Sequence, residues 1–492
     1  MRKPLVPAIA VVLSLMSGGA TACVLGAVYN LPIPFGMYAS GATAALVASF
    51  AIVAYVLKSE PARSALPGPV AHVGEPLQVR LSARLVGVAA WISVGCLLLT
   101  VTTGVYGTQN ILANPGMTLF WIVFSLGMTY ATALVGDLYS LINPWLKLCN
   151  WIERFDSAAF RGRSNYPRRL AYYPALLLYM SFIWIELFGE IQPRTLSGVL
   201  LGYTGLNLTA AWLFGKEAWF RYGEFFSVFF RLIGKIAPIE YVRTTDDDGS
   251  YVVRLRKPFM ALLDAHADHV SLLLFVLFML SSTAFDGVHS TQPWVVLFWR
   301  HIYPLLAAGF DEPYFFFLNI YYAWQWSMLI LSPFVYLAAY LLLIWIAKRV
   351  ASSKIPLRAL ALRFAFTLIP IAFVYNMTHY YGELLSQGVQ IVRMISDPFS
   401  LGWNLFGTNG LFLDTITLDA GMVWHTQVAL ILFGHIVSVY LAHVEALKAF
   451  PNRRHAALSQ APMLVLMVLL TTVGLWILSL PIDAGQIVTP PV

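Results

Sequence analysis

Residues 326–347 read WSMLILSPFVYLAAYLLLIWIA and contain no Asp, Glu, Lys or Arg. An α-helix rises about 1.5 Å per residue, so about 20 apolar residues cross the hydrocarbon core of a bilayer. This stretch therefore predicts a transmembrane helix.

Ten further apolar runs of similar length occur along the chain, at 5–29, 35–57, 85–106, 117–143, 171–189, 197–214, 266–285, 359–386, 421–446 and 461–480. Hydrophobic residues make up 59% of the 492 residues and charged residues 11%, far from the proportions of a soluble domain. We predict an all-α, polytopic transmembrane helical bundle of about ten spans, with the lipid bilayer as its partner. The formal charge of +7 lies in loops and not on a soluble basic face, which argues against nucleic acid.

Basic residues mark one side of the predicted membrane. If the amino terminus is cytoplasmic, all Lys and Arg except Arg194, Arg300 and Arg393 fall at that terminus or in the loops 58–84, 144–170, 215–258, 348–363 and 447–460. Positive charge concentrates on the cytoplasmic side of membrane proteins. The sequence therefore predicts a multi-pass protein of the bacterial cytoplasmic (inner) membrane, with its carboxyl terminus outside.

The first run resembles an export signal. Arg2 and Lys3 precede the apolar stretch Val6–Met16, and small residues follow at Ala20–Ala22, an order typical of signal peptides. Residues 1–29 are therefore either a cleaved signal peptide or a retained first transmembrane helix. Residues 30–492 are expected to form one transmembrane domain, with outer caps at 286–325 and 387–420.

One cytoplasmic segment has a different periodicity. Ile239–Pro258, within the loop 215–258, alternates apolar and polar residues on both sides of Asp246–Gly249. Such alternation around a turn sequence predicts a small β-hairpin.

Ionisable residues within the spans are the candidate functional residues. Burying charge in hydrocarbon costs several kcal/mol, so such residues face the interior of a bundle and have partners. His379 and Glu383 are spaced i, i+4, and Asp286 and His289 are spaced i, i+3, which suits metal ligation or acid–base work. Glu186 and His425 are expected at a similar, outward level. A single such histidine is more often a hydrogen-bonded structural residue, and it is their convergence that favours a site.

Two further histidines lie deeper in the membrane, in the predicted helix 421–446. His435 is expected near the midplane and His443 nearer the inner end, where Asp137 in Gly136–Ser140 could pair with it. Such a pair is either functional or a structural hydrogen bond between helices.

Several short segments, in order along nearly the whole chain, resemble the bacterial membrane proteins known as fenitrothion hydrolases. They are Asn30–Phe35, Gly136–Asp137 with Asn143–Trp145, Ser281–Asp286 with Pro293–Trp294, Tyr375–Asn376 with His379–Tyr380, Ser396–Gly407, and Gly434–His435 with Ala442–His443. Members of that family tend to begin their mature chain with Ala-His-Gly. Here Ala20–Val24 has no histidine, so a metal ligand at that place would be missing.

The resemblance implies cleavage of the P–O–aryl bond of an apolar organophosphorus triester. It assigns His379, His435, His289 and Asp286 to binding a divalent metal or activating water, and Glu186 and Glu383 to accepting protons or orienting those groups. The identity of the metal and the need for a second membrane subunit stay open.

Two other classes of function stay open as well. Glu186, His379, His435, His443 and Asp137 would descend through the bilayer as a proton or cation path in a transport protein. Paired histidines on facing helices would also suit a haem or copper membrane protein.

Overall fold

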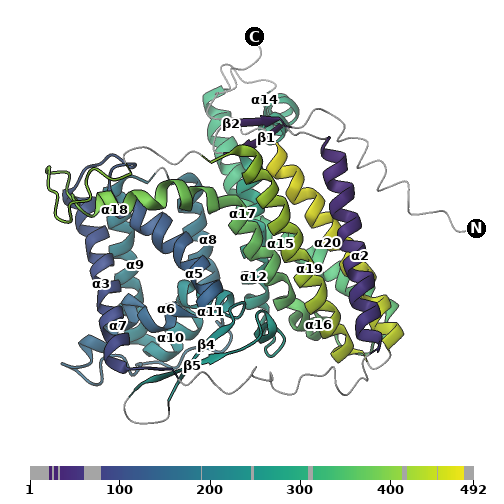
Figure 1. The fold of residues 1–492 in the computed structure, drawn as a ribbon, viewed down its shortest axis with the longest axis horizontal. Coiled ribbons are helices and arrows are strands. Elements are labelled where there is room, and N and C mark those ends of the chain that lie inside the picture. The colour runs from purple at the N-terminus through teal and green to yellow at the C-terminus, as the bar shows by residue number, and fades with distance from the viewer. Residues whose placement is uncertain are drawn as a thin grey trace, which may run out of the picture. The chain divides into compact units, whose positions relative to one another are not determined.

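A computed structural model describes residues 21–24, 27–30, 34–59, 79–189, 191–244, 249–307, 314–412, 418–450 and 453–480 of the chain. The predicted fold class is confirmed, because the described chain is mostly helical with one small antiparallel sheet besides a short two-stranded pair (Figure 1). The chain divides into two compact units. Unit 1 comprises Met1–Ala65, Leu277–His379 and Leu418–Val492, and unit 2 comprises Leu66–Val276 and Tyr380–Thr417.

Among the described residues, eight helical stretches are long and apolar enough to cross a membrane, and the chain is a multi-pass membrane protein by this criterion. They are Phe35–Ile52, Ala83–Tyr106, Pro115–Val135, Val270–His289, Phe316–Val350, Leu357–Met394, Ala420–Ala449 and Ala456–Ser479. Each overlaps one of the predicted runs.

Three of the eleven predicted runs do not give such a helix. The run 171–189 forms α8 (Tyr173–Phe188), which has only 16 residues. The run 197–214 forms α9 (Pro193–Phe214), which is 22 residues long but carries polar and glycine residues that lower its hydropathy. Of the run 5–29, residues 5–20 lie outside the described part, while Thr21–Val24 (β1) and Ala27–Asn30 (β2) pair as antiparallel strands instead of continuing a helix.

The run 117–143 is interrupted. Its helix consists of α4 (Pro115–Met117), the π-helical segment Thr118–Gly127 and α5 (Met128–Val135). It ends at Gly136, whose φ of +96° is a conformation that glycine adopts without strain. A separate short helix, α6 (Leu138–Ile142), follows.

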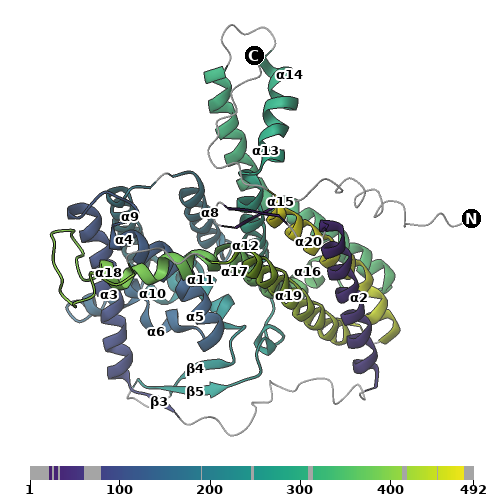
Figure 2. The ribbon, with the colours of Figure 1, turned by 45° about the horizontal axis from the view of Figure 1, so that its top comes forward.

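Unit 1 is built around its carboxyl-terminal helices. The helices α2 (Phe35–Ser59), α19 (Ala420–Ala449) and α20 (Arg453–Ser479) pack together, and α15 (Tyr314–Val350) lies against α20 (Figures 1 and 2). Their core contains Phe35, Ala39, Ala42, Tyr375, Ile431 and Leu475. Close packing of α19 requires Gly434, because a Cβ atom there would lie 2.2 Å from Val374 Cγ2. Val374 belongs to α17 (Ile369–Gln387).

The described residues of the predicted outer cap 286–325 are largely helical. The helix α12 (Val270–His289) is followed by α13 (Gln292–Val296), a π-helical segment Leu297–Ile302 and α14 (Tyr303–Ala307) (Figure 2). Aromatic rings join this arm to the start of α15, with centroid distances of 4.5 Å for Trp294–Trp324 and 5.5 Å for Tyr303–Phe317. Because the later residue of the arm contacts the earlier residue of α15, the arm and the start of α15 run antiparallel.

Unit 2 contains the remaining helices and the sheet. The helix α3 (Ala83–Tyr106) packs against α9 and α7 (Pro144–Ile152), and α11 (Phe225–Gly234) packs against α5, α6 and α8. The helix α10 (Lys216–Tyr222) precedes α11.

The predicted β-hairpin of unit 2 is confirmed. Strands β4 (Ile239–Arg243) and β5 (Tyr251–Leu255) pair antiparallel with Ile239 opposite Leu255. A third strand, β3 (Arg80–Leu81), extends the sheet beside β5. Residues 246–248 of the predicted turn lie outside the described residues.

The second predicted cap, 387–420, contains the short helix α18 (Ile391–Met394) and a hydrogen-bonded loop. The Asn404 side-chain oxygen accepts bonds from Ser396 Oγ at 3.0 Å and from the Asn409 backbone N–H at 3.1 Å. The Asp397 carboxylate accepts from the backbone N–H groups of Leu401 and Gly402. These bonds account for the polar and glycine residues of the cap as turn-forming residues.

Candidate functional site

The central pair of the candidate site joins two helices of unit 1. His379 Nε2 on α17 lies 2.8 Å from Asp286 Oδ2 on α12, a distance typical of a charge-assisted hydrogen bond. The side chains are 23% and 12% exposed, respectively. They are therefore sheltered but still reachable from outside the unit, as an acid–base pair must be.

His289 flanks the pair on the same helix as Asp286. Its Nδ1 atom lies 2.8 Å from the Asp286 backbone oxygen and 3.8 Å from Asp286 Oδ1. The His289 ring also stacks on Phe285, with centroids 5.5 Å apart and planes 12° apart. Both contacts hold the imidazole beside the carboxylate, as the i, i+3 spacing predicted.

A glycine lets a third helix approach this site. A Cβ atom on Gly287 would lie 2.6 Å from Ile477 Cγ2 of α20 and 3.9 Å from His379 Cε1. Any larger residue at position 287 would push α20 away from α12. Gly287 was not singled out from the sequence, although a glycine between Asp286 and His289 in an apolar helix is the signal that could have identified it.

His435, the fourth predicted metal ligand, has a different environment. Its side chain is 1% exposed in the interior of unit 1, and Nδ1 lies 2.8 Å from the Ile431 backbone oxygen of its own helix. Its Nε2 atom has no hydrogen-bond partner among the described residues.

The predicted metal site gains no support from this geometry. Within the described ranges, no group of three or more His, Cys, Asp or Glu side chains is placed to hold a metal ion. The two possible metal-ligand atoms of Asp286 and His379 face each other, which is the arrangement of an acid–base pair. Metal binding by His379, His435, His289 and Asp286 therefore stays a prediction.

Glu186 and Glu383 line a cavity of unit 2. The cavity has a volume of about 240 Å³, and its wall includes Trp121, Tyr380 and several aliphatic side chains. Glu186 comes from α8 and Glu383 from the part of α17 that belongs to unit 2. The two carboxylates thus share one space, as their predicted common level suggested.

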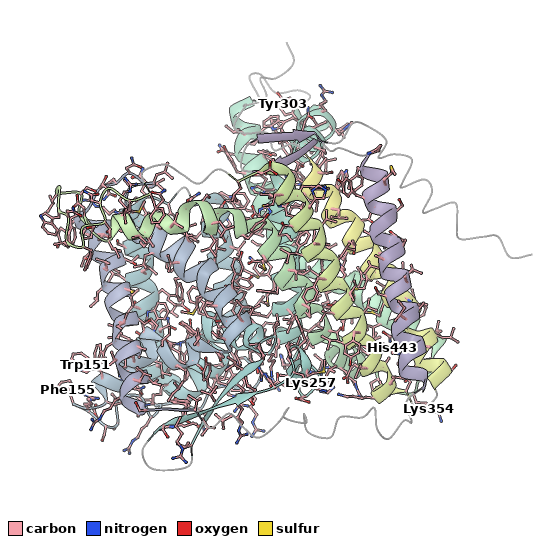
Figure 3. All side chains as sticks on the ribbon, viewed as in Figure 1. Trp151, Phe155, Lys257, Tyr303, Lys354 and His443 are labelled. Carbon is pink, nitrogen blue, oxygen red and sulfur yellow. The ribbon has the colours of Figure 1, made fainter. Side chains whose placement is uncertain are left out.

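Asp137 belongs to unit 2 and His443 to unit 1, and each has contacts with other residues of its own unit. Asp137 caps α6, where its Oδ1 accepts the Ser140 backbone N–H at 3.1 Å. The ring of His443, which is labelled in Figure 3, contacts Phe50 edge-on at 6.1 Å. The predicted Asp137–His443 pair stays a prediction. The capping role of Asp137 was missed, although an Asp directly before a helix is a recognisable N-cap.

Two buried acids, Glu224 and Glu445, were missed from the sequence, and Glu224 is the more deeply buried of the two. Glu224 is 0% exposed, caps α11 by accepting the backbone N–H groups of Phe226 and Ser227, and is hydrogen-bonded to Tyr203. It lies in the segment 215–258 that was predicted as a cytoplasmic loop. The apolar sequence Phe225–Gly234 behind it was the available signal for a packed helix.

No protein-family model, curated protein or solved structure matches this chain.

Proposed function

We propose that the chain is an integral membrane hydrolase in which Asp286 and His379 activate water for attack on an organophosphorus triester. The observation that carries the proposal is the 2.8 Å contact between His379 Nε2 and Asp286 Oδ2. A carboxylate that accepts the Nε2–H bond favours the tautomer whose Nδ1 atom can accept a proton. His379 is then a general base oriented by Asp286.

The reaction follows from these roles. Nδ1 of His379 takes a proton from water while the water oxygen forms a bond to phosphorus. The bond between phosphorus and the aryl oxygen breaks, and the leaving aryl oxide takes the proton back from the imidazolium. Asp286 stabilises the imidazolium through its negative charge in a sheltered place, where electrostatic interactions are stronger than in water.

The substrate class rests on two supports. The resemblance to fenitrothion hydrolases implies an aryl phosphotriester, and such an apolar compound partitions into a bilayer beside the apolar spans. The distribution of Lys and Arg supports a cytoplasmic membrane location with Asp286 and His379 on the periplasmic side. In this proposal, His289 positions Asp286.

The proposal is tested with purified protein in detergent and fenitrothion as the substrate. We expect release of the coloured nitrophenol by the natural protein and loss of release in Asp286→Asn. A matched control is His425→Ala, because His425 is exposed on α19 and its Nδ1 bonds to the Gly421 backbone oxygen at 2.7 Å. Absence of release by the natural protein, or equal release by Asp286→Asn, would refute the proposal.

A proton or cation path is the second candidate function. The observation that favours it is the pair of buried imidazoles on α19, because His435 Nε2 and His443 Nδ1 both have no hydrogen-bond partner among the described residues. Buried polar atoms of this kind commonly bond to internal water. A pH-sensitive dye inside sealed vesicles distinguishes the two functions, since transport predicts flux that His435→Phe abolishes and hydrolysis predicts none. An absorption spectrum tests the haem alternative at the same time, because bound haem gives a Soret band.

A further inference from the structure

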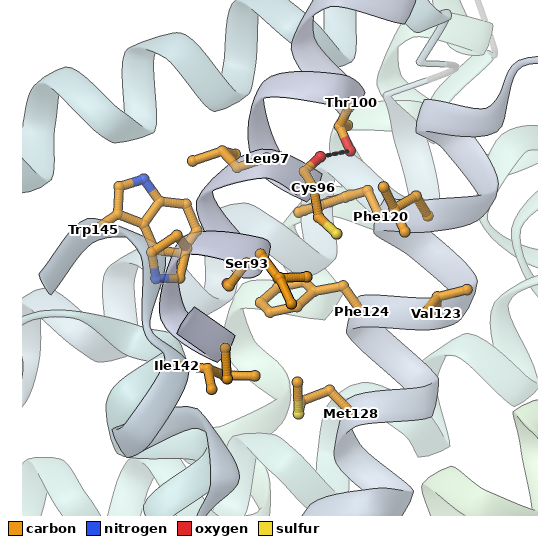
Figure 4. A pocket seen from close by; sticks show the side chains of 14 residues that line it. Ser93, Cys96, Leu97, Thr100, Phe120, Val123, Phe124, Met128, Ile142 and Trp145 are labelled. Carbon is orange, nitrogen blue, oxygen red and sulfur yellow. Dashed lines mark hydrogen bonds between the residues drawn. The ribbon is translucent and has the colours of Figure 1, made fainter. Parts of the chain in front are cut away.

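An apolar cavity in unit 2 is lined by none of the residues to which a catalytic or metal-binding role was given above. Its volume is about 320 Å³, and it is lined by residues of α3, of the π-helical segment Thr118–Gly127, of α5 and of the chain around α6 and α7. Figure 4 shows the side chains of Cys96, Phe120, Phe124, Met128 and Trp145 around the common space. The volume is near the lower end for small-molecule sites, which is about 300–1,000 Å³.

Two of the polar side chains in the wall are hydrogen-bonded to neighbouring residues. Thr100 Oγ1 donates to the Cys96 backbone oxygen at 2.9 Å, the contact drawn in Figure 4. Trp145 Nε1 donates to Thr204 Oγ1 at 2.9 Å. Apart from the hydroxyl of Ser93 and the thiol of Cys96, the cavity offers hydrocarbon, aromatic and thioether surface, so a polar ligand would lose most of its hydrogen bonds to water on entering.

The π-helical segment shapes one wall. Hydrogen bonds from residue i to i+5 widen the turn relative to an α-helix. Residues spaced by four and five, such as Leu119, Val123 and Phe124, then stay on the same side, and all three line the cavity. A regular α-helix would rotate part of this apolar row away from the space.

The wall is continuous with the lipid-facing surface of α3. Ile92 lines the cavity and is 62% exposed, and it lies on a helix whose Leu85, Val88 and Leu98 are also exposed. Because α3 is long and apolar enough to cross a membrane, the acyl chains of lipids are the molecules expected at this surface. A hydrocarbon chain could pass Ile92 without leaving an apolar environment.

We infer that this cavity binds one acyl chain of a bilayer phospholipid. The chain contacts the side chains of α3 and the π-helical segment, and the headgroup stays outside the cavity. The site is independent of the proposed hydrolytic pair, which belongs to unit 1.

The experiment uses the full chain in nanodiscs made of phospholipid with a photoreactive diazirine on its acyl chain. After irradiation, peptide mass spectrometry locates the labelled residues. We expect labels on cavity residues such as Cys96 and Phe120, and a decrease of about tenfold in Ser93→Phe, because the added ring fills the space. Val88→Phe is the matched control, since Val88 is exposed on the same helix but does not line the cavity.

A second variant and a second measurement keep the test decisive if Ser93→Phe does not fold. Ala89→Leu fills the same cavity with a smaller change and should also decrease labelling, and native mass spectrometry should detect a retained phospholipid in the natural protein. Equal cavity labelling in Ser93→Phe, Ala89→Leu and Val88→Phe, or labels confined to exposed residues such as Leu85, would overturn the inference. Recovery of another apolar molecule, such as an isoprenoid quinone, in place of phospholipid would overturn it as well.

Discussion

His379 Nε2 and Asp286 Oδ2 lie 2.8 Å apart although 92 residues separate them along the chain, and they join α17 to α12. The contact brings an imidazole and a carboxylate from two helices together in unit 1. His289 reaches the same carboxylate from within α12 but at the longer distance of 3.8 Å. The two histidines should therefore differ in their importance for hydrolysis.

We predict that His289→Ala lowers the rate of phosphotriester hydrolysis by about tenfold, whereas His379→Ala lowers it by about 10²–10⁴-fold, the range for loss of a general base. In the proposed mechanism His289 only positions Asp286, while His379 accepts the proton. Initial rates at saturating substrate measure both effects. A larger loss in His289→Ala than in His379→Ala would reverse the assigned roles.

Gly136→Ala should destabilise unit 2 strongly. The φ of +96° strains an L-residue, and the new Cβ atom would lie 2.6 Å from the Ile239 backbone oxygen. We expect a loss of about 2–3 kcal/mol in the free energy of unfolding. Thermal unfolding monitored by circular dichroism measures the change. Gly95→Ala is the matched control, because Gly95 is in α3 with no atom within 4 Å of the added Cβ, and it should be neutral or slightly stabilising.

Arg363 and Glu445 form a buried ion pair between α16 (Leu357–Phe364) and α19 in unit 1. Arg363 Nε lies 2.5 Å from Glu445 Oε1, and the glutamate is 2% exposed. Arg363→Met should cost about 2–3 kcal/mol, less than for a fully buried pair, because Arg363 is partly exposed and Lys448 Nζ, 3.6 Å from Glu445 Oε2, still faces the carboxylate. The control Arg358→Met, at an exposed position of the same helix, should change the melting temperature little. Adding Glu445→Gln to Arg363→Met should restore part of the loss, and a further loss would argue against the pair.

Cys149 should resist alkylation until the protein unfolds. Burial raises the pKa of its thiol to about 12, and its side chain is 0% exposed. At pH 8 a thiol with that pKa is about 10⁻⁴ thiolate, against about a quarter for an ordinary cysteine. Iodoacetamide labelling of the Cys149 peptide at pH 8, followed by mass spectrometry, should be negligible in the folded protein and complete in denaturant. Rapid labelling of the folded protein would contradict the packing of α7.

Hydropathy predicted most of the fold because lipid imposes length and apolar composition on each span. Hydropathy could not distinguish the π-helical segment Thr118–Gly127 from an α-helix, because the hydropathy of a segment depends on its composition and not on its hydrogen-bond pattern. It also extended that span past Gly136, where a positive φ ends the helix. The hairpin Ile239–Pro258 was predictable because its period of two differs from that of its surroundings.

The candidate site was predictable only in part. Spacing within one helix predicted the proximity of Asp286 and His289, because helical geometry determines it. The i, i+4 relationship of His379 and Glu383 stays a prediction. The Asp286–His379 contact depends on how α12 and α17 pack, which no local pattern encodes. The cap formed by Glu224 was missed because α11, which it begins, is too short to cross a membrane, and its segment was assigned to a loop.

The most direct test of the central claim is a double-mutant cycle on phosphotriester hydrolysis with Asp286→Asn, His379→Gln and the double variant. If the two side chains act as one acid–base unit, each single variant should lose about 10²–10⁴-fold in kcat, and the double variant should lose no more than the worse single variant. Losses that multiply in the double variant, or full activity in either single variant, would contradict the account.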